Sequence, residues 1–282
     1  MTDFQKARTR QIISSVIKVI FTLIFLFPFW IMISTSFKTQ SETMASAYSL
    51  IPKTWTLAGY KYFLVDLNLN IWLYLKNTLV VTFSVIFLQL IVAIPAGYAF
   101  AKHEFYFKGS FFAIVLSSLM MPSQVTFITI YIMMAKAKLI GTLWPQIIPF
   151  GAYAFGIFLL RQNFKQVSNE IIESARLDGA SEMKLLVSIL VPMMKATLAT
   201  LALFSFVGHW NSYFWPLVIT QSDKVRPLSI FVKQVSAMTP DGEGVKWNAV
   251  MAANLVFIAP IMIAYIIANK NIVKTYGYKG VK

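Results

Sequence analysis

Four of the chain's eleven acidic residues gather in one short segment, residues 169–192, and this is the first place to look for chemistry. These four acids are Glu170, Glu173, Asp178 and Glu182. The segment has no histidine beside them, and the whole sequence has no cysteine and only two histidines, His103 and His209. No base, nucleophile or metal-ligand cluster accompanies the acids, so an active site is not indicated. We expect the acids to act at helix ends or in recognition, and we predict no metal site and no enzymatic activity.

The residues around these acids predict two short helices joined by a tight turn. Ser168 or Asn169 can cap the first helix, whose opening turns hold two of the acids, as the positive end of a helix prefers. Gly179 then ends it, because glycine adopts the left-handed cap conformation at low cost. Ser181 can cap a second helix that runs into Pro192. The first helix would have a small apolar face, made of Ile171, Ile172, Ala175 and Leu177.

Three interpretations of this segment compete. It could be an ordinary loop with some helix, a DNA-reading helix-turn-helix, or a docking element that lies in the groove of a partner protein. The spacing of Ala175 and Gly179 fits the turn of a helix-turn-helix. The second helix argues against that interpretation because it lacks the Arg, Asn and Gln side chains that read base edges. Its polar residues are mostly Ser181, Glu182, Lys184 and Ser188.

A second group of polar and aromatic residues lies within otherwise apolar stretches. Amide side chains can pair with hydroxyl groups, and aromatic rings offer flat faces to the C–H face of a sugar. We therefore expect a substrate path here, although Trp210, Tyr213 and Trp215 could instead form an aromatic belt at a membrane interface. The substrate-path candidates are Ser123, Gln124, Thr126, His209, Trp210, Asn211, Tyr213 and Trp215, with Ser212 among them.

The elements that must position these residues are membrane-spanning helices. Hydrophobic residues make up 57% of the sequence and charged residues 13%, about half the charged fraction of a soluble domain. The net charge is +14, but the basic residues are scattered at the ends of apolar stretches, which favours lipid headgroups over nucleic acid. We predict an all-α polytopic protein with six spans at about Ile12–Ser34, Trp72–Ala101, Ser110–Met134, Thr142–Leu160, Met193–Ile219 and Trp247–Ala268.

The predicted organisation follows from these spans. Residues 1–11 would be a cytoplasmic N-terminus, 12–71 the first transmembrane helix with an external loop, 72–268 the main transmembrane domain, and 269–282 a cytoplasmic tail. Lys and Arg are denser in the loops that become cytoplasmic if both termini are inside. The expected location is therefore the plasma membrane, with several passes and with residues 169–192 on the cytoplasmic side.

The predicted spans contain neither a fuel site nor an ion relay. No Asp or Glu lies inside any of them, whereas proton- or sodium-coupled carriers usually use intramembrane carboxylates or unwound ion sites. The sequence also lacks the glycine-rich G-x-x-x-x-G-K-[ST] loop that cradles ATP phosphates. An energised transporter built on this chain would have to use a separate ATPase subunit.

A family resemblance agrees with this requirement. Glu173-Ser174-Ala175, three residues, Gly179, nine residues, Ile189, one residue and Val191-Pro192 resemble the EAA loop of ABC importer permeases. Every spacing is kept, with Ser174 and Val191 as mild departures from Ala and Leu. Phe158 to Gln162 and Leu177 to Ala180 also resemble the carbohydrate branch, of the maltose-transporter type. The resemblance implies ATPase-coupling roles for Glu170, Glu173, Ala175, Asp178, Gly179, Ile189 and Pro192.

The resemblance also implies a fold, a function and partners. The expected fold is the type I importer permease, and the expected function is import of a di- or oligosaccharide delivered by an extracytoplasmic solute-binding protein. A second permease and two ABC ATPases would complete the complex, and these ATPases, not this chain, would bind ATP and Mg. A glycerol-phosphate or other small-solute importer, or a membrane-anchored helix-turn-helix regulator, are the alternatives. The sequence does not name the sugar.

Overall fold

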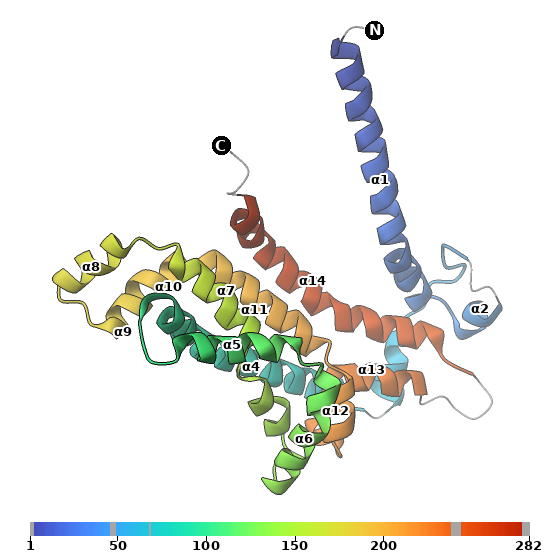
Figure 1. The fold of residues 1–282 in the computed structure, drawn as a ribbon. Helices are drawn as coiled ribbons and strands as arrows, with labels where there is room; N and C mark the ends of the chain where they lie inside the picture. The colour runs from blue at the N-terminus through green and yellow to red at the C-terminus, as the bar shows by residue number, and fades with distance from the viewer. Residues whose placement is uncertain (1–2, 46–48, 68, 238–243, 278–282) are drawn as a thin grey trace. The chain divides into compact units, whose positions relative to one another are not determined.

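The computed structural model describes residues 3–45, 49–67, 69–237 and 244–277, and the described chain is helical without strands. Its helices and helical turns are α1 (Asp3–Ser36), α2 (Gln40–Ala45), α3 (Ala58–Lys61), η1 (Tyr62–Asp66), α4 (Ile71–Lys102), α5 (Lys108–Met120), α6 (Ser123–Lys136), η2 (Trp144–Gln146), η3 (Ile148–Phe150), α7 (Ala154–Lys165), α8 (Asn169–Leu177), α9 (Glu182–Lys184), η4 (Leu185–Leu190), α10 (Val191–Met193), α11 (Lys195–Trp210), α12 (Phe214–Ile219), η5 (Asp223–Val225), α13 (Leu228–Ala237) and α14 (Trp247–Gly277). The predicted all-α class is confirmed (Figure 1).

The chain divides into two compact units. The first contains Met1–Ile71 and Val232–Ala259, and the second contains Trp72–Phe231 and Pro260–Lys282. In the first unit, the short helices α2 and α3 follow the long apolar helix α1. The Asn248 amide donates a hydrogen bond to the Lys38 carbonyl at 3.1 Å, and the Asn248 backbone lies so close to Gly59 that a Cβ there would be 2.8 Å from it. These contacts tie α14 to the loop after α1.

The core of the second unit lies between α4, α7 and α11 and extends to the segment from α8 to α10. Small residues in α4 allow a close approach to α7. A Cβ on Gly97 would lie 2.8 Å from the Leu160 Cβ, and Leu160 is fully buried. Ala93 and Tyr98 of α4 and Phe164 of α7 belong to the same buried cluster. A larger side chain at Gly97 would therefore push the two helices apart.

Long apolar helices are present, but fewer than the six predicted spans. Within the described residues, Arg10–Ser36, Ile71–Lys102 and Trp247–Ala268 are long and apolar enough to cross a membrane. Two bent pairs bring the number to five if each pair is one span: Lys108–Met120 with Gln124–Lys136, bent by 104°, and Glu182–Met193 with Lys195–Trp210, bent by 80°. These helices make the chain a multi-pass membrane protein.

The predicted span Thr142–Leu160 is not one continuous helix. Its first half forms the two 3₁₀ turns η2 and η3, which contain Pro145 and Pro149, and α7 begins only at Ala154. Proline lacks an amide hydrogen and clashes with the preceding turn, so two prolines four residues apart prevent a long α-helix here. Pro122 likewise separates α5 from α6 within the predicted span Ser110–Met134.

Candidate functional site

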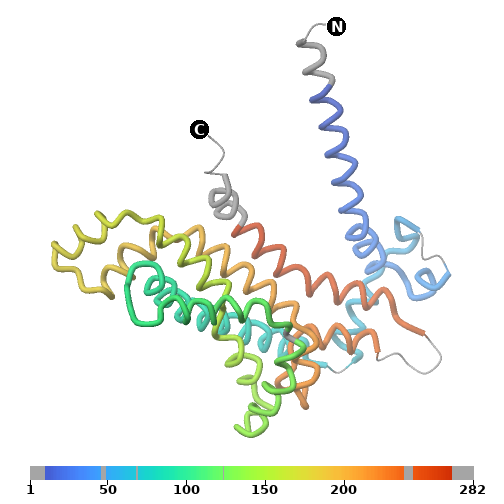
Figure 2. The backbone as a smooth tube through the Cα atoms, viewed as in Figure 1, coloured from blue at the N-terminus to red at the C-terminus, as the bar shows by residue number. Residues whose placement is uncertain are grey.

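The segment from α8 to α10 has the caps that its sequence predicts. The Ser168 hydroxyl accepts a hydrogen bond from the Glu170 amide at 3.1 Å, and the Ser181 hydroxyl accepts one from the Lys184 amide at 3.3 Å. Between them, Gly179 has a φ of +77°. Its amide donates to the Arg176 carbonyl, and the next amide donates to the Ala175 carbonyl, both at 3.0 Å. This pair of bonds is the Schellman arrangement that ends α8. Figure 2 shows the chain doubling back here.

The buried face of α8 is narrower than predicted. Ile172 and Ala175 are buried, but Ile171 is partly exposed and Leu177 is 88% exposed. The prediction for Leu177 was therefore wrong, because Leu177, the last residue of α8, lies two positions after the buried Ala175 and so on the opposite side of the helix. An apolar side chain that is exposed at a helix end suits a protein contact.

The structure also rules against the helix-turn-helix alternative. The second helix does not end after α9 but continues as the π-helix η4 and then α10. Leu185 and Leu190 in η4 are fully buried, and Leu186 is buried as well. The residues that this helix leaves exposed include Glu182, Lys184 and Ser188, and none of its exposed side chains is the Arg, Asn or Gln that reads base edges.

The exposed side of the segment is hollowed. An open depression of about 630 Å³ lies between α8 and the second helix. Four of the predicted coupling residues, Glu170, Ala175, Asp178 and Ile189, line it together with Ile171, Ser174, Ala180 and Lys184. Glu173 is exposed on α8, and Pro192 lies in α10. The depression thus combines two carboxylates and the Lys184 ammonium with apolar side chains, which is a surface suited to a protein partner.

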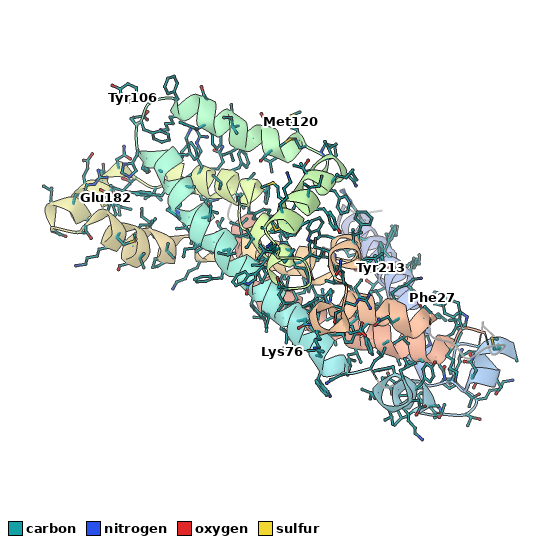
Figure 3. All side chains as sticks on the ribbon, turned by 90° about the horizontal axis from the view of Figure 1, so that it is seen from below. Phe27, Lys76, Tyr106, Met120, Glu182 and Tyr213 are labelled. Carbon is teal, nitrogen blue, oxygen red and sulfur yellow. The ribbon has the colours of Figure 1, made fainter. Side chains whose placement is uncertain are left out.

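Glu182 joins this segment to the end of α4, a link that the sequence did not reveal. The Tyr98 hydroxyl donates a hydrogen bond to Glu182 Oε2 at 2.7 Å, and Arg176 donates from Nε and Nη2 to Oε1, each at 2.8 Å. His103 Nε2 lies 3.5 Å from Oε2. The Tyr98 hydrogen bond, with Arg176 and His103, lowers the pKa of the Glu182 carboxyl below its ordinary value. In Figure 3, Glu182 lies beside the C-terminal end of α4, and Lys76 lies near the other end of that helix.

The second group of predicted residues meets in an aromatic cavity. A cavity of about 310 Å³ brings the start of α6 to the segment around α12. Its lining includes four of the predicted substrate-path residues, Gln124, Thr126, Tyr213 and Trp215, and also Ser212. Phe127, Ile130, Phe150 and Phe214 complete it. The mixture of ring faces with hydroxyl and amide groups is what binding of a sugar requires.

The ring of Trp215 is held firmly in this cavity. Its indole nitrogen donates a hydrogen bond to the Pro145 carbonyl at 2.9 Å. Phe127 packs edge-on against it at a centroid distance of 5.4 Å, and Phe150 does so at 6.1 Å. A ring that is fixed on three sides loses little conformational freedom on binding a ligand.

The other substrate-path candidates lie elsewhere. Trp210 is fully buried and stacks on Phe206 at 5.1 Å, and the amide of Asn211 donates to the Val207 carbonyl at 2.9 Å. Neither lines the cavity. His209 lies behind its Phe150 wall, with the two ring centroids 5.3 Å apart. The side chain of Ser123 falls outside the described residues.

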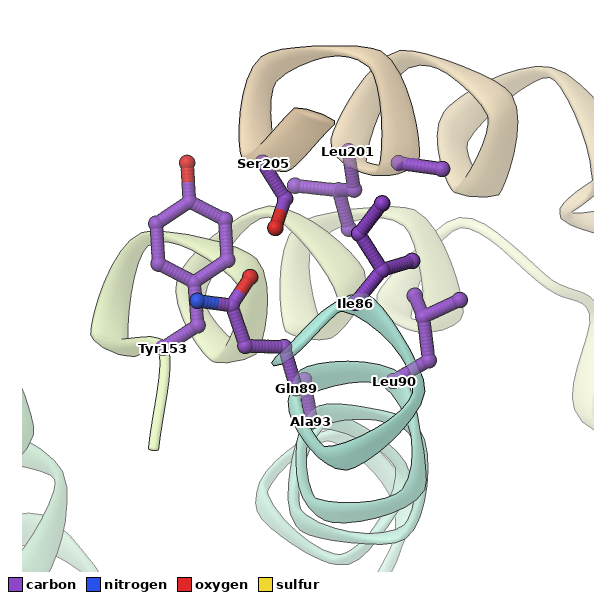
Figure 4. A pocket seen from close by; sticks show the side chains of 8 residues that line it. Ile86, Gln89, Leu90, Ala93, Tyr153, Leu201 and Ser205 are labelled. Carbon is purple, nitrogen blue, oxygen red and sulfur yellow. The ribbon is translucent and has the colours of Figure 1, made fainter. Parts of the chain in front are cut away.

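A compact polar group lies inside the helix bundle behind this wall. Gln89 of α4 donates a hydrogen bond to the Phe150 carbonyl at 2.9 Å, and its amide nitrogen lies 3.2 Å from His209 Nε2. Figure 4 shows the Gln89 side chain between Tyr153 and Ser205, where α4 faces α11. Polar contacts of this kind hold helices together where no water is present. Among the described side chains, none forms a group of three potential metal ligands.

Some residues of the cavity and of the Glu182 link were not predicted, because little in the neighbouring sequence indicates their role. Phe127 and Ile130 follow Gln124 and Thr126 at helical spacing on α6, and this could have added them to the path. Phe150 follows Pro149 in a 3₁₀ turn, and only the folding of that turn against α12 brings it to the cavity. Tyr98 lies 84 residues before its partner Glu182, so no spacing could have joined them.

The chain matches a described family over most of its length. The family described as "Binding-protein-dependent transport system inner membrane component" matches residues 91–277. The chain is 28% identical over 282 residues to the arabinooligosaccharides transport system permease protein AraQ of Halalkalibacterium halodurans, covering 98% of this chain and 99% of that protein. It is 30% identical over 257 residues to the sn-glycerol-3-phosphate transport system permease protein UgpE of Escherichia coli, covering 89% of this chain and 90% of that protein.

Two solved structures have a similar fold. A chain of a bacterial ABC transporter involved in the import of the acidic polysaccharide alginate superposes with a TM-score of 0.83 at 25% identity, covering 94% of this chain and 97% of that chain. A chain of the MetNI methionine ABC transporter superposes with a TM-score of 0.52 at 16% identity, covering 76% of this chain and 96% of that chain. The second likeness concerns the fold alone.

Proposed function

We propose, from the premise that this chain belongs to the binding-protein-dependent transport system inner membrane component family, that it is the sugar-translocating permease of an ATP-driven importer. The observation that carries the proposal is the exposed helical hairpin of α8 and α9, whose spacing matches the EAA loop and whose turn is fixed by Gly179 at a φ of +77°. The chain itself is a transport subunit, not an enzyme, and ATP would be hydrolysed by partner subunits.

The docking partner of this hairpin would be an ABC ATPase. The depression of about 630 Å³ offers two carboxylates, one ammonium group and apolar side chains to a complementary surface. We assign ATPase coupling to Glu170, Glu173, Ala175, Asp178, Gly179, Ile189 and Pro192. When the ATPase pair closes on ATP, two such hairpins would be drawn together, and the attached spans would turn the cavity outward. The hairpin would then lie on the cytoplasmic side, as would both termini.

The substrate is inferred to be a neutral sugar. The aromatic cavity of about 310 Å³ is lined by five aromatic rings together with amide and hydroxyl groups, and its lining includes no Lys or Arg. The AraQ relative is named for arabinooligosaccharide transport, which agrees with this chemistry. An extracytoplasmic solute-binding protein would deliver the sugar, and a second, non-identical permease would complete the translocation path.

A glycerol-phosphate importer is the second candidate because the UgpE relative is named for that solute. A phosphate group is usually bound by Arg or Lys, whose charge offsets the cost of removing the anion from water. The cavity offers neither, so the neutral sugar fits it better.

The test is uptake by the reconstituted complex of this chain, its sister permease, the ATPases and the binding protein. We expect ATP-dependent uptake of a labelled neutral oligosaccharide that is not inhibited by glycerol-3-phosphate. Cysteines introduced at Gln124 or Ser212 should be protected from labelling by the sugar, and a cysteine at Asn211 serves as the matched control outside the cavity. Uptake without ATP, or selective uptake of glycerol-3-phosphate, would contradict the proposal.

A further inference from the structure

The end of α4 is attached to the hairpin at two points, the start of α8 and the start of α9. At the start of α8, the Lys102 ammonium donates hydrogen bonds to the Val167 carbonyl at 2.6 Å and to Asn169 Oδ1 at 2.8 Å. Beyond the end of α8, Tyr98 donates to the Glu182 carboxylate at 2.7 Å. The hairpin is therefore bound to α4 through side chains as well as to α7 and α11 through the chain itself.

The Tyr98 contact is the buried part of this attachment. Tyr98 is only 4% exposed, and its ring packs edge-on against Phe164 of α7 at 5.8 Å and against His103 at 5.0 Å. Because these rings fix the direction of the hydroxyl, the hydrogen bond can be made only while the carboxylate stays where it is. A link held in this way transmits displacement instead of absorbing it.

The Arg176 contact is different in kind. The side chains of Arg176 and Glu182 are 44% and 49% exposed, and ion pairs at such surfaces contribute little to stability because water screens them. Arg176 lies in the last turn of α8 and Glu182 begins α9, so this pair spans the Gly179 turn. Its role is to orient the carboxylate toward Tyr98 and to keep the two arms of the hairpin together.

We propose that the hydrogen bond from Tyr98 to Glu182 is a positioning link that passes movement of the α8–α9 hairpin directly to α4. This inference rests on the proposed function, in which the hairpin is moved by an ATPase. It adds a third moving helix to the two that continue the hairpin along the chain, α7 and α11. Since Gln89 of α4 bonds to the Phe150 carbonyl, and Phe150 lines the aromatic cavity, the link also connects the hairpin to that cavity wall.

The test compares coupling with assembly in the reconstituted complex. Loss of a hydrogen bond to a charged group shifts an equilibrium by about tenfold or more. We expect Tyr98→Phe to leave ATPase association intact, with ATP hydrolysis within about twofold of wild type, while sugar moved per ATP falls about tenfold. Glu182→Ala should lose at least as much coupling, because it also removes the Arg176 pair, and the double variant should be no worse than Glu182→Ala alone. Glu182→Gln keeps an acceptor for Tyr98 and should retain most coupling.

Glu104→Gln is the matched control. Glu104 pairs with Lys108 at 2.8 Å just beyond the same end of α4, and its side chain is 90% exposed. This variant should couple like wild type. Wild-type coupling in both Tyr98→Phe and Glu182→Ala, or additive losses in the double variant, would overturn the inference.

A second readout does not depend on which solute is carried. Lys76 is exposed near the far end of α4 from Glu182 (Figure 3), and the chain is free of cysteine, so Lys76→Cys can carry a single fluorescent label. ATP binding to the assembled complex should change the label's signal, and Tyr98→Phe should reduce that change about tenfold. A full response in Tyr98→Phe, or no response in wild type, would overturn the link. A normal response without sugar uptake would instead overturn the sugar assignment.

Discussion

Gly179 allows the mechanical role of the hairpin to be tested by a single methyl group. Its φ of +77° lies in the left-handed region, and a Cβ placed there would meet no atom within 4 Å. The cost of Gly179→Ala is therefore backbone strain alone, about 1–2 kcal/mol. This cost corresponds to about a 5- to 30-fold loss in the population of the closed turn. The hydrogen bonds that depend on the turn are those from the amides of Gly179 and Ala180.

Hydrogen exchange of these two amides is the direct assay. In Gly179→Ala, both should exchange about 5- to 30-fold faster than in wild type, and ATP-driven uptake should fall. Asn tolerates the left-handed region better than most residues, so Gly179→Asn should restore slow exchange in part. Gly179→Asp adds a charged side chain to the docking surface and should stop uptake while the chain still inserts into the membrane.

Gly109→Ala is the control for this series. A Cβ on Gly109 also meets no atom within 4 Å, but its φ does not lie in the left-handed region. Exchange and uptake should stay at wild-type values in this variant. The reasoning would be refuted by unchanged exchange in Gly179→Ala, or by wild-type uptake in Gly179→Asp.

Three further predictions concern other positions. Glu173→Ala should weaken co-purification with the ATPase more than membrane insertion, because the carboxylate is exposed on α8; unchanged co-purification and unchanged uptake would contradict this. Gly97→Leu should lower the melting temperature and the amount of folded protein, because its Cβ would lie 2.8 Å from that of Leu160; a wild-type melting temperature would show that α4 and α7 can separate. Because the Tyr98 hydrogen bond lowers the folded-state pKa of Glu182, its stabilising effect is complete above the ordinary carboxyl pKa and is lost as the pH falls through the lowered value. The difference in melting temperature between wild type and Glu182→Gln should thus shrink as the pH falls below the ordinary carboxyl pKa, and a difference that grows there would disprove the assignment.

Much of the hairpin could be predicted because its determinants are local. The Ser168 and Ser181 caps and the left-handed Gly179 are each set by the residue type and by neighbours a few positions away, so the sequence places them correctly. Leu177 was misjudged because only its apolar character was considered. It follows the buried Ala175 by two residues, which at about 100° per residue places it on the opposite side of the helix.

The cavity could be predicted only in part. Gln124 and Trp215 stand out as polar or amphipathic groups in apolar stretches, and both line it. Trp210 and Asn211 carry the same signal but point elsewhere, because a helix turns about 100° per residue and neighbours in sequence face different directions. Thr142–Leu160 was predicted to be one span because its hydropathy is high, yet the prolines at 145 and 149 decided its backbone.

By itself, the sequence determined the helical class, the membrane setting and the capped hairpin, since each depends on composition or on residues within one or two turns. Tertiary structure alone decided that Tyr98 meets Glu182 across 84 positions and that α6 and α12 share one cavity. The reason is physical: a hydrogen bond or a ring contact depends on distance in space, and packing of helices such as α4 against α7 sets that distance, independently of separation along the chain.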